Sequence, residues 1–586
     1  MTPRLPIRPG QRGSGLDASS TPRAHGTVWA LVICGAAGVF FGHPNPLCSF
    51  PFAVLAYPFC LHVLAAQAPT DATAFLRGWL LGLVGNSVGL YWLLIPMHDV
   101  GGLPYAPSAV SVVLLSAYLA CYPAFAGLSM RYLRRFFRLP AGGSDRSAAK
   151  GGPFFAVAAA LLSGAVFAGS EVLCGTVLTG FPWLSLANAF SVWPEWIQAA
   201  SLVGGYGLGG CLAAAACLGA VAMLGISRSG SAIPLFSALC ILAAMPVYGY
   251  IRLGQPTPQA RPLSFLMVQG NIEQNTKWEP AFQKGTLRHY MDLSEKRMRE
   301  LHGAVPPQKP DIVLWPETAM PFYFQAHPDY SALLHRFAIQ HNTNLAFGTL
   351  GAERAPDDPY GEFLIFNRLY MLSPKGDIAG HYDKQRLVPF GEYIPFGRSL
   401  EALRNLLQGL DFTPGAAVSP IQVARPEASA PESSGEESAV VPSAPPPESA
   451  PSLGVLICYE AIFPELAQDR VENGATLLLN ISNDGWFGRT SAPLQHLGHA
   501  VMRAVEQGRA IARSTNTGYT ASIDARGRIL ERGQELFVED TLFVSLQPSD
   551  EITVYHRLHP FPEVFLALAT LFALVFGRFA AGRKQE

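Results

Sequence analysis

Seven long apolar stretches follow one another through the first 250 residues, and they constrain the fold more than any other feature. They cover about 27–43, 50–67, 75–97, 106–128, 154–176, 196–224 and 232–251, and an eighth covers 561–578. Several approach the ~20 residues that a helix needs to cross ~30 Å of hydrocarbon. A single stretch could be a buried core helix, but soluble domains do not bury seven in succession. We therefore predict a polytopic α-helical membrane domain over 27–251, with about seven transmembrane helices, and a C-terminal transmembrane helix.

The composition supports this interpretation. Charged residues make up only 15% of the chain, whereas soluble domains carry about a quarter. The net charge of -1 argues against nucleic acid as a partner. Four arginines before the first stretch would also fit a cleaved signal peptide. The six apolar stretches that follow favour an uncleaved first helix instead.

Basic residues are distributed unevenly among the loops. They gather in the tail at 1–26, in the loop after the fourth stretch and in the tail at 579–586, whereas the loops near 44–49, 98–105 and 177–195 contain no Lys or Arg. Cytoplasmic loops are the ones enriched in Lys and Arg. We therefore predict eight spans, cytoplasmic tails at both ends, and residues 252–560 on the outer side.

The outer region has the pattern of an α/β domain. Short apolar runs typical of buried strands lie at 263–269, 311–315, 344–350, 453–458 and 476–481. Helical patterns lie near 279–303, 329–341 and 493–513. Strands that alternate with helices predict a layered α/β sheet.

One segment of the outer region breaks this pattern. Residues 415–452 are rich in Ala, Pro, Ser and Glu and contain few large apolar side chains. Such a composition cannot bury enough surface to offset the entropy of ordering. We predict a disordered insertion at about 424–451. A domain boundary is the alternative, and it is less favoured because a strand pattern resumes at Leu453.

One cysteine lies apart from the others in the sequence. Eight of the nine cysteines lie in the apolar N-terminal half, and only Cys458 lies in the outer region. This pattern does not suggest a disulfide framework. A lone cysteine is either an inert core residue or a nucleophile.

Three outer segments could carry chemistry. Glu317 follows the strand-like DIVLW, at the end of a strand where α/β sheets tend to place ligands. Lys384 lies in YDKQR, and Cys458 ends the apolar run VLIC. A solvated loop carboxylate and a surface charge cluster are the alternatives for the first two. Together the three supply a base, an electrostatic stabiliser and a nucleophile, and the backbone N–H of Tyr459 would be an oxyanion donor.

Neither a metal nor an organic cofactor is expected. His496 and His499 lack Cys or acidic partners at the spacing of a zinc site. A Gly-rich phosphate loop is also absent from the sequence.

The order of these motifs resembles a known superfamily. WPE, YDKQRLVPFGEYIP and ICYE, in that order, resemble the nitrilase superfamily, which has a Glu–Lys–Cys triad in an αββα sandwich. The N-terminal spans, VQGNIEQNTKW, FGEYIP and SNDGWFG followed by Gln495 and His496 resemble its membrane-embedded branch, the apolipoprotein N-acyltransferases. The resemblance covers about 27–578. The insertion at 415–452 is a departure from the family pattern.

The resemblance implies roles for eight residues. Glu317 would be the general base and acid, Lys384 the stabiliser and Cys458 the nucleophile. Supporting or substrate-binding roles fall to Trp278, Glu392, Tyr459, Glu460 and, in a mobile loop, Trp486.

The implied activity is an acyl transfer in the bacterial inner membrane, with the catalytic domain in the periplasm. A fatty acyl group would pass from a glycerophospholipid, through a Cys458 thioester, to the α-amino group of the diacylglyceryl-cysteine of an apolipoprotein. A membrane-tethered amidase with the same triad is one alternative, although eight spans are excessive for a tether. A transporter or scaffold with an inactive outer domain is another, and Glu171 is its main candidate residue.

Overall fold

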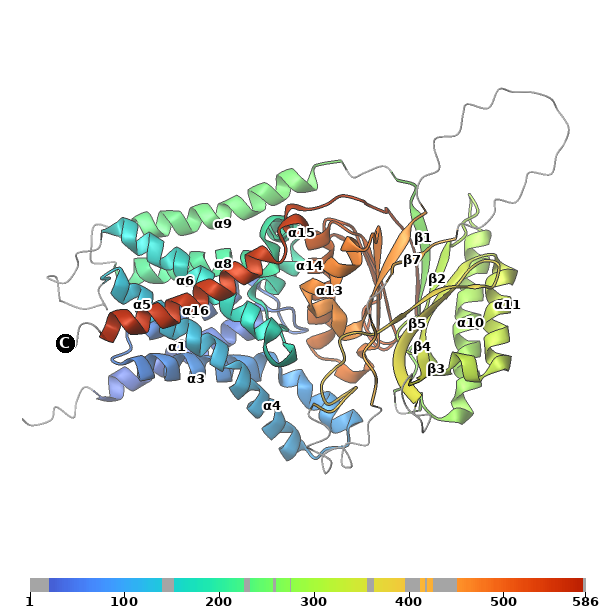
Figure 1. Cartoon of the computed structure of the whole chain (residues 1–586), viewed down its shortest axis with the longest axis horizontal. Helices are drawn as coiled ribbons and strands as arrows, with labels where there is room; N and C mark the ends of the chain where they lie inside the picture. Colours follow the sequence, from blue (N-terminus) through green and yellow to red (C-terminus); the bar gives the residue numbers. More distant parts are fainter. Residues whose placement is uncertain are drawn as a thin grey trace, which may run out of the picture.

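The chain folds into a helical half and an α/β half that pack against each other (Figure 1). The computed structural model describes residues 21–139, 152–225, 232–256, 260–274, 276–355, 363–395, 411–416, 419–424 and 450–582. The C-terminal helix runs back along the helical half, so that the α/β half is inserted between two helical segments of the chain (Figure 1).

Every apolar stretch predicted from the sequence is helical. The helices are α1 (Thr21–Gly42), η1 (Pro51–Leu55) with α2 (Ala56–Ala66), α3 (Asp71–Gly89) followed by η2 (Tyr91–Leu93) and η3 (Pro96–Val100), α4 (Tyr105–Leu119), α5 (Cys121–Phe136), α6 (Pro153–Thr176), α8 (Ala200–Leu224), α9 (Ala232–Leu253) and α16 (Phe561–Gly582). Three short elements, η4 (Val177–Thr179), η5 (Leu186–Val192) and α7 (Pro194–Ile197), connect α6 to α8.

Within the described residues, six helical segments are long and apolar enough to cross a membrane, and one of them, Tyr105–Phe136, consists of α4 and α5 together. A seventh candidate is the pair 71–89 and 91–100, which is bent by 57° at its break. The helix Pro51–Ala66 is apolar but shorter. The eight predicted stretches therefore all exist as helices, and the prediction of eight spans remains a prediction.

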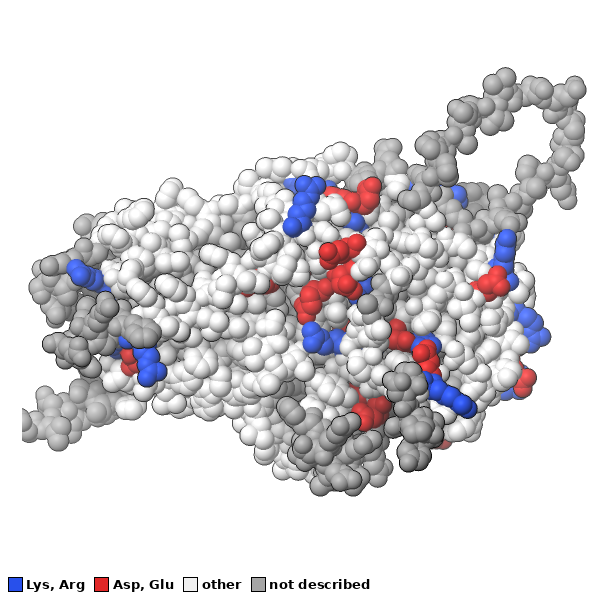
Figure 2. Space-filling model, viewed as in Figure 1, with Lys and Arg blue, Asp and Glu red and all other residues white. Residues whose placement is uncertain are grey.

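Charge is distributed as a membrane-spanning half requires. In Figure 2 the helical half shows a broad face almost free of charged groups. Basic residues lie at its far end, and mixed charges lie where it meets the α/β half. At the far end Arg131 and Arg135 both pair with Asp71 at the start of α3. The uncharged face matches what a hydrocarbon environment tolerates.

The α/β half contains two sheets. The first has the order β13-β1-β2-β4-β5-β6, with β3 paired to β4. Its strands are β1 (Leu263–Gln269), β2 (Ile312–Leu314), β3 (Met320–Tyr323), β4 (Asn344–Arg354), β5 (Phe363–Leu372), β6 (Ile378–Asp383) and β13 (Asp540–Leu546). The second has the order β12-β11-β10-β9-β8-β7. Its strands are β7 (Ile421–Gln422), β8 (Ser452–Ile457), β9 (Leu477–Ser482), β10 (Ile511–Thr515), β11 (Ala521–Ile523) and β12 (Ile529–Arg532).

Helices cover the outer face of each sheet, which gives an αββα sandwich. One core lies between the sheets and joins Phe265, Leu314 and Ile457 among others. A second lies between the first sheet and the helices α10 (Pro280–His302) and α11 (Pro328–His341). The other pair, α13 (Pro464–Glu472) and α14 (Ala492–Gln507), shares a continuous core with the membrane helices. The predicted fold class is confirmed, and one helical layer of the sandwich lies against the membrane domain (Figure 1).

The elements predicted for residues 252–560 are all present, although the helix expected near 493–513 ends at Gln507 and the strand β10 begins at Ile511. The sequence showed only five of the thirteen described strands. The missed strands carry mixed side chains: β10 contains the buried polar residues Arg513, Ser514 and Thr515, and β12 is exposed along its length. Neither gives the apolar run by which the sequence identified β1 or β9. Most of the predicted disordered insertion, residues 425–449, lies outside the described residues.

Candidate active site

Cys458 lies where β8 ends and a short 3-10 turn, η7 (Cys458–Ile462), begins. Its φ angle is +52°, a left-handed conformation that few residues other than glycine adopt. The side chain is buried, with 7% exposed. A strained strand-to-helix turn of this kind presents a nucleophile beside backbone N–H groups that have no intrahelical partner.

Glu317 follows β2, whose strand is parallel to β1 and β4. It is buried, and its carboxylate accepts hydrogen bonds from the Nδ2 atom of Asn367 at 2.8 Å and the backbone N–H of Asn483 at 2.9 Å. Because Asn483 directly follows β9, the carboxylate bridges the two sheets.

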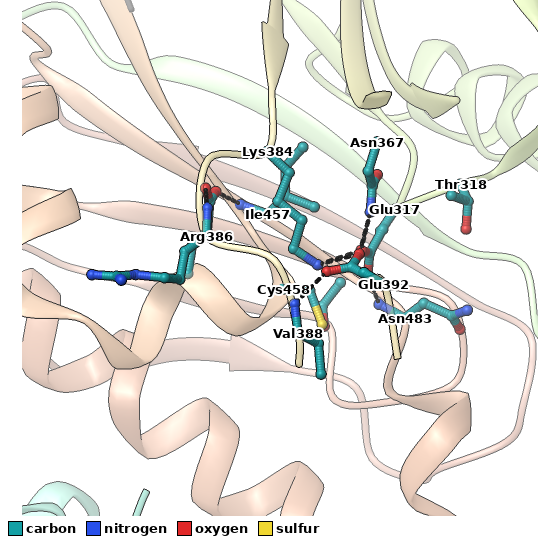
Figure 3. Close-up of polar contacts among 12 residues, drawn as sticks. Glu317, Thr318, Asn367, Lys384, Arg386, Val388, Glu392, Ile457, Cys458 and Asn483 are labelled. Carbon is teal, nitrogen blue, oxygen red and sulfur yellow. Dashed lines mark hydrogen bonds and ion pairs between the residues drawn. The ribbon is translucent and has the colours of Figure 1, made fainter. Parts of the chain in front are cut away.

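Lys384 follows the last residue of β6 and joins two carboxylates. Its Nζ atom lies 3.2 Å from Oε1 of Glu317 and 2.8 Å from Oε1 of Glu392. Asn367 donates to both carboxylates, at 2.8 Å and 3.0 Å. Figure 3 shows Cys458 beside this cluster. The structure thus brings together Glu317, Lys384, Glu392 and Cys458, which come from three separate segments.

The electrostatics favour a neutral thiol beside a charged carboxylate. Burial, reinforced by the Glu317 carboxylate, raises the pKa of Cys458 well above its usual value. Burial also acts to raise the pKa of Glu317, but Lys384 and the hydrogen bond from Asn367 outweigh it, and that pKa is lowered. Burial acts to lower the pKa of Lys384, but Glu317 and Glu392 raise it. At neutral pH the cluster therefore holds a thiol, a carboxylate and an ammonium.

Glu460 connects the segment of Lys384 to the turn of Cys458. Its Oε1 atom accepts hydrogen bonds from the hydroxyl of Tyr382 at 2.6 Å, from the N–H of Gln385 at 2.7 Å and from the N–H of Arg386 at 3.2 Å. Its Oε2 atom accepts from the N–H of Ile457 at 2.7 Å. The carboxylate thus fixes the backbone on both sides of the site.

Tyr459 points from the same turn toward the membrane domain. Its hydroxyl donates to the carbonyl of Gly180 at 3.2 Å, and its ring stacks on Phe181 with centroids 6.3 Å apart. Next to them Trp183 packs against Trp92, with centroids 4.6 Å apart. Trp92 of η2, together with Phe181 and Trp183 of the loop after α6, therefore forms an aromatic floor beneath the candidate site.

Behind Cys458 lies a buried charged group that the sequence did not reveal. The Nε2 atom of His496 faces the carbonyl of Cys458 at 2.9 Å, and its Nδ1 atom faces Oδ1 of Asp484 at 3.0 Å. Arg513 donates to Oδ2 of Asp484 at 2.8 Å. Burial acts to raise the pKa of Asp484, but Arg513 and His496 outweigh it and lower the pKa.

Cys458, Asp484 and His496 also have the spacing of a metal site, with candidate ligand atoms within 4.8 Å of one another. Both carboxylate oxygens of Asp484 already accept hydrogen bonds, Oδ1 from Ser482 and Oδ2 from Arg513. The positive charge next to the Asp484 carboxylate is already supplied by the guanidinium of Arg513. These side chains therefore do not fit a metal centre well, and we interpret them as a support for the Cys458 turn.

The two tryptophans are less closely tied to the cluster. Trp278 is half-buried just before α10, and its neighbour Lys277 reaches the backbone carbonyl of Glu317. Trp486 is half-buried on the turn η8 (Asp484–Phe487). Their predicted roles in substrate binding remain predictions.

Sequence reasoning missed Asn367, Lys277 and the pair Asp484 and Arg513. Asp484 belongs to the SNDGWFG segment, so its place in a motif was a usable signal. Asn367 lies within β5 and Arg513 within β10, and nothing in their local sequence indicates which side chains they meet across the sheets.

Comparison with known proteins first defines the class. The pattern of the carbon-nitrogen hydrolase family matches residues 267–555. That of the apolipoprotein N-acyltransferase N-terminal domain matches residues 36–218. A mutant of the Nesterenkonia AN1 amidase from the nitrilase superfamily has a TM-score of 0.34 at 17% identity, over 52% of this chain and 97% of the amidase. The two family patterns identify the α/β half as a carbon-nitrogen hydrolase domain joined to a membrane domain.

Full-length relatives then define the family. The chain is 33% identical to the apolipoprotein N-acyltransferase of Geobacter metallireducens, over 97% of this chain and 98% of the relative. It is also 33% identical to the Bordetella bronchiseptica enzyme of the same name, over 97% of this chain and 100% of the relative. The chain belongs to the apolipoprotein N-acyltransferase family, and it is an acyltransferase.

Proposed function

We propose that this protein transfers a fatty acyl group from a glycerophospholipid to the α-amino group of an N-terminal diacylglyceryl-cysteine, through a thioester on Cys458. The observation that carries the proposal is the buried cluster in which one Lys384 ammonium contacts both Glu317 and Glu392 beside the thiol. This cluster has the protonation states that a base-assisted thiol nucleophile requires.

In the first half-reaction Glu317 takes the proton of the thiol, and the Cys458 sulfur attacks the ester carbonyl. The Lys384 ammonium and the backbone N–H of Tyr459 stabilise the negative charge that develops on the carbonyl oxygen. The tetrahedral adduct collapses, its carbon–oxygen bond breaks, and the lysophospholipid oxygen leaves with the proton held by Glu317. A thioester remains.

In the second half-reaction the free amine of the lipoprotein attacks the thioester carbon. Glu317 takes a proton from the amine, an amide bond forms and the carbon–sulfur bond breaks. Glu317 then returns the proton to the sulfur of Cys458. Neither step needs a metal or a nucleotide, because the thioester conserves the reactivity of the ester.

The position of the site supports substrates that are anchored in lipid. The aromatic floor of Trp92, Phe181 and Trp183 comes from the membrane domain and reaches Tyr459 beside the nucleophile. We infer that the acyl chain of each substrate approaches from the bilayer side of this floor. A small-amide hydrolase would have no use for such an approach.

We also propose that the membrane is the bacterial inner membrane and that the catalytic domain lies in the periplasm. The basic far end of the helical half, with Arg131, Arg134 and Arg135, supports a cytoplasmic location for that end. A reporter that is active only in the cytoplasm, fused after Ile251, should therefore stay silent. A strong signal would contradict this orientation.

The direct test is mass spectrometry of the intact protein. Incubation with phospholipid alone should add one acyl mass, and neutral hydroxylamine should remove it. Cys458→Ala should carry no adduct, whereas Cys240→Ala, which removes an exposed thiol of α9, should carry it fully. A diacylated lipopeptide with a free amine should discharge the adduct, and an N-blocked lipopeptide should not. Discharge by water at the same rate with either peptide would identify an amidase.

A further inference from the structure

A second buried lysine lies next to the cluster, and the proposed mechanism does not use it. Lys277 precedes α10, and only 1% of its surface is exposed. Its Nζ atom donates to Oγ1 of Thr318 at 2.6 Å and to the backbone carbonyl of Glu317 at 3.4 Å. Burial lowers the pKa of Lys277 to about 7, and the attraction of Glu317 offsets this only in part. A lysine is rarely buried in this way without a specific partner.

The partner, Thr318, has an unfavourable backbone conformation. Residues 316–319 form a turn in which the N–H of Ala319 donates to the carbonyl of Pro316 at 3.2 Å. Thr318 is the third residue of the turn, and its φ angle is +46°. Glycine or asparagine normally occupies such a position, and a β-branched residue there is an outlier. Glycine would relieve the strain, but it lacks the hydroxyl that Lys277 binds.

The turn at 316–319 also packs closely against the strand β4. A Cβ atom at Gly348 of β4 would lie 2.5 Å from the backbone nitrogen of Thr318 and 2.8 Å from the Cα atom of Glu317. The N–H of Gly348 donates to the carbonyl of Pro316 at 3.2 Å. β4 thus limits how the turn can move, and the Lys277 contact fixes the side chain of its strained residue.

The Glu317 carboxylate depends on this turn for its direction. It leaves the residue next to Thr318 and meets Lys384 at 3.2 Å and the N–H of Asn483 at 2.9 Å. A change in the backbone at Thr318 would rotate the adjacent peptide and displace the carboxylate. Displacing a catalytic group by ~1 Å can cost ~10²-fold in rate.

We propose that Lys277 is a positioning residue for the acyl transfer. Its Nζ atom binds the hydroxyl of Thr318 and so holds the backbone of Thr318 in the left-handed conformation. This conformation orients the carboxylate of Glu317 toward the thiol of Cys458. The inference rests on the proposed role of Glu317 as the base. It assigns to Lys277, rather than to Trp278, the contact of this segment with the catalytic cluster.

The first test compares two substitutions of Thr318. Thr318→Ser keeps the hydroxyl, and Thr318→Val keeps the branched shape but removes it. We expect single-turnover acylation by phospholipid to be about ten- to a hundredfold slower in Thr318→Val, whereas Thr318→Ser should stay close to the wild type. The lipid concentration at half-saturation should not change in either. Equal rates for the two variants would overturn the inference.

The second test asks whether the lysine acts through the strained turn. Lys277→Met should slow acylation to a similar extent, and Lys284→Met, which removes an exposed lysine of α10, should not. Thr318→Gly adopts the left-handed conformation without strain. The double variant Lys277→Met/Thr318→Gly should therefore acylate faster than Lys277→Met alone. A double variant as slow as Lys277→Met would overturn the inference, because a residue needed only for folding or charge would not be rescued by glycine.

One further variant separates this inference from the proposed function. Glu317→Gln should abolish the acyl adduct if Glu317 is the base. If Glu317→Gln acylates normally, the proposed function of the cluster fails. If Glu317→Gln is inactive and both Lys277→Met and Thr318→Val match the wild type, only the role of Lys277 fails.

Discussion

Oε1 of Glu506, on helix α14 of the α/β half, accepts a hydrogen bond at 2.7 Å from the backbone N–H of Gly205, inside membrane helix α8. α8 is broken there, since Gly204 has a φ angle of +72°. A break leaves N–H groups without partners, and a side chain of the catalytic domain satisfies one of them. Arg503 pairs with the same carboxylate at 2.7 Å and donates to the carbonyl of Ile462, at the end of the turn that begins with Cys458. The two halves are therefore joined by a buried polar contact as well as by apolar packing.

We predict that Glu506→Ala lowers the stability of the whole chain. It would leave the guanidinium of Arg503 buried without its partner and the N–H of Gly205 unsatisfied. Loss of one member of a buried ion pair costs about 3–5 kcal/mol. The melting temperature in detergent should fall markedly, and that of Glu472→Ala, an exposed carboxylate of α13, should not change. If Glu506→Ala melted at the same temperature as the wild type, the stability of the chain would not depend on this contact between the two halves.

A second prediction concerns Glu460. In Glu460→Gln an amide NH₂ replaces one of the two oxygens that accept four hydrogen bonds, and a donor would then face a donor. We expect the segment of Lys384 to shift relative to the Cys458 turn, so that kcat falls by about tenfold or more while KM changes little. Steady-state kinetics with phospholipid and lipopeptide would measure both. Glu465→Gln, at a partly exposed carboxylate that pairs with Arg386, is the matched control. An increase in KM alone would contradict the positioning role.

A third prediction follows from the ionisation of Glu317. Its pKa is lowered, because Lys384 and Asn367 outweigh the effect of burial. A base with a lowered pKa stays ionised as the pH falls, so acylation should persist through mildly acidic pH and decline only below the usual range of a glutamate. Asn367→Ala removes a hydrogen bond that favours the carboxylate, so the pKa of Glu317 should rise.

The measurement is single-turnover acylation as a function of pH. In the pH–rate profile of Asn367→Ala, the acidic side, where the acylation rate falls, should lie at higher pH than in the profile of the wild type. Asn473→Ala, at an exposed residue after α13, should leave the acidic side of the profile in place. An acidic side that moves to lower pH in Asn367→Ala would contradict the assignment of Glu317 as the base.

The sequence predicted the parts of this site that are attached to apolar strands. Glu317 and Cys458 follow the buried strands β2 and β8, whose apolar runs are visible along the chain, and Lys384 lies in a motif of the family. The residues that contact Glu317 and its turn, Asn367 and Lys277, do not stand in the apolar runs that the sequence revealed. Asn367 faces Glu317 only because β5 pairs with β4, and Lys277 reaches Thr318 only because the segment after β1 folds back over the turn. Contacts of this kind depend on register and packing, which local patterns do not encode.

The last prediction concerns the segment rich in Ala, Pro, Ser and Glu. Its two ends are held together: β7 pairs antiparallel with β8, with Ile421 opposite Leu453, and the N–H of Val423 donates to the carbonyl of Pro451 at 2.9 Å. The carbonyl of Ala424 accepts a further hydrogen bond from Asn344 at 2.8 Å. The segment at 425–449 therefore connects two neighbouring strands, and a short linker can replace it.

We expect a chain in which a short Gly/Ser linker replaces residues 425–449 to fold and to form the acyl adduct at the wild-type rate. Since each halving of a loop lowers its closure cost by about 0.6 kcal/mol, stability should be equal or about 1 kcal/mol higher. A longer deletion that also removes Ile421–Gln422 should be less stable, because Ile421 is buried between the sheets. Melting temperature and adduct formation, measured together, distinguish the outcomes. Loss of the adduct at an unchanged melting temperature in the shorter deletion would show that the segment takes part in the reaction itself.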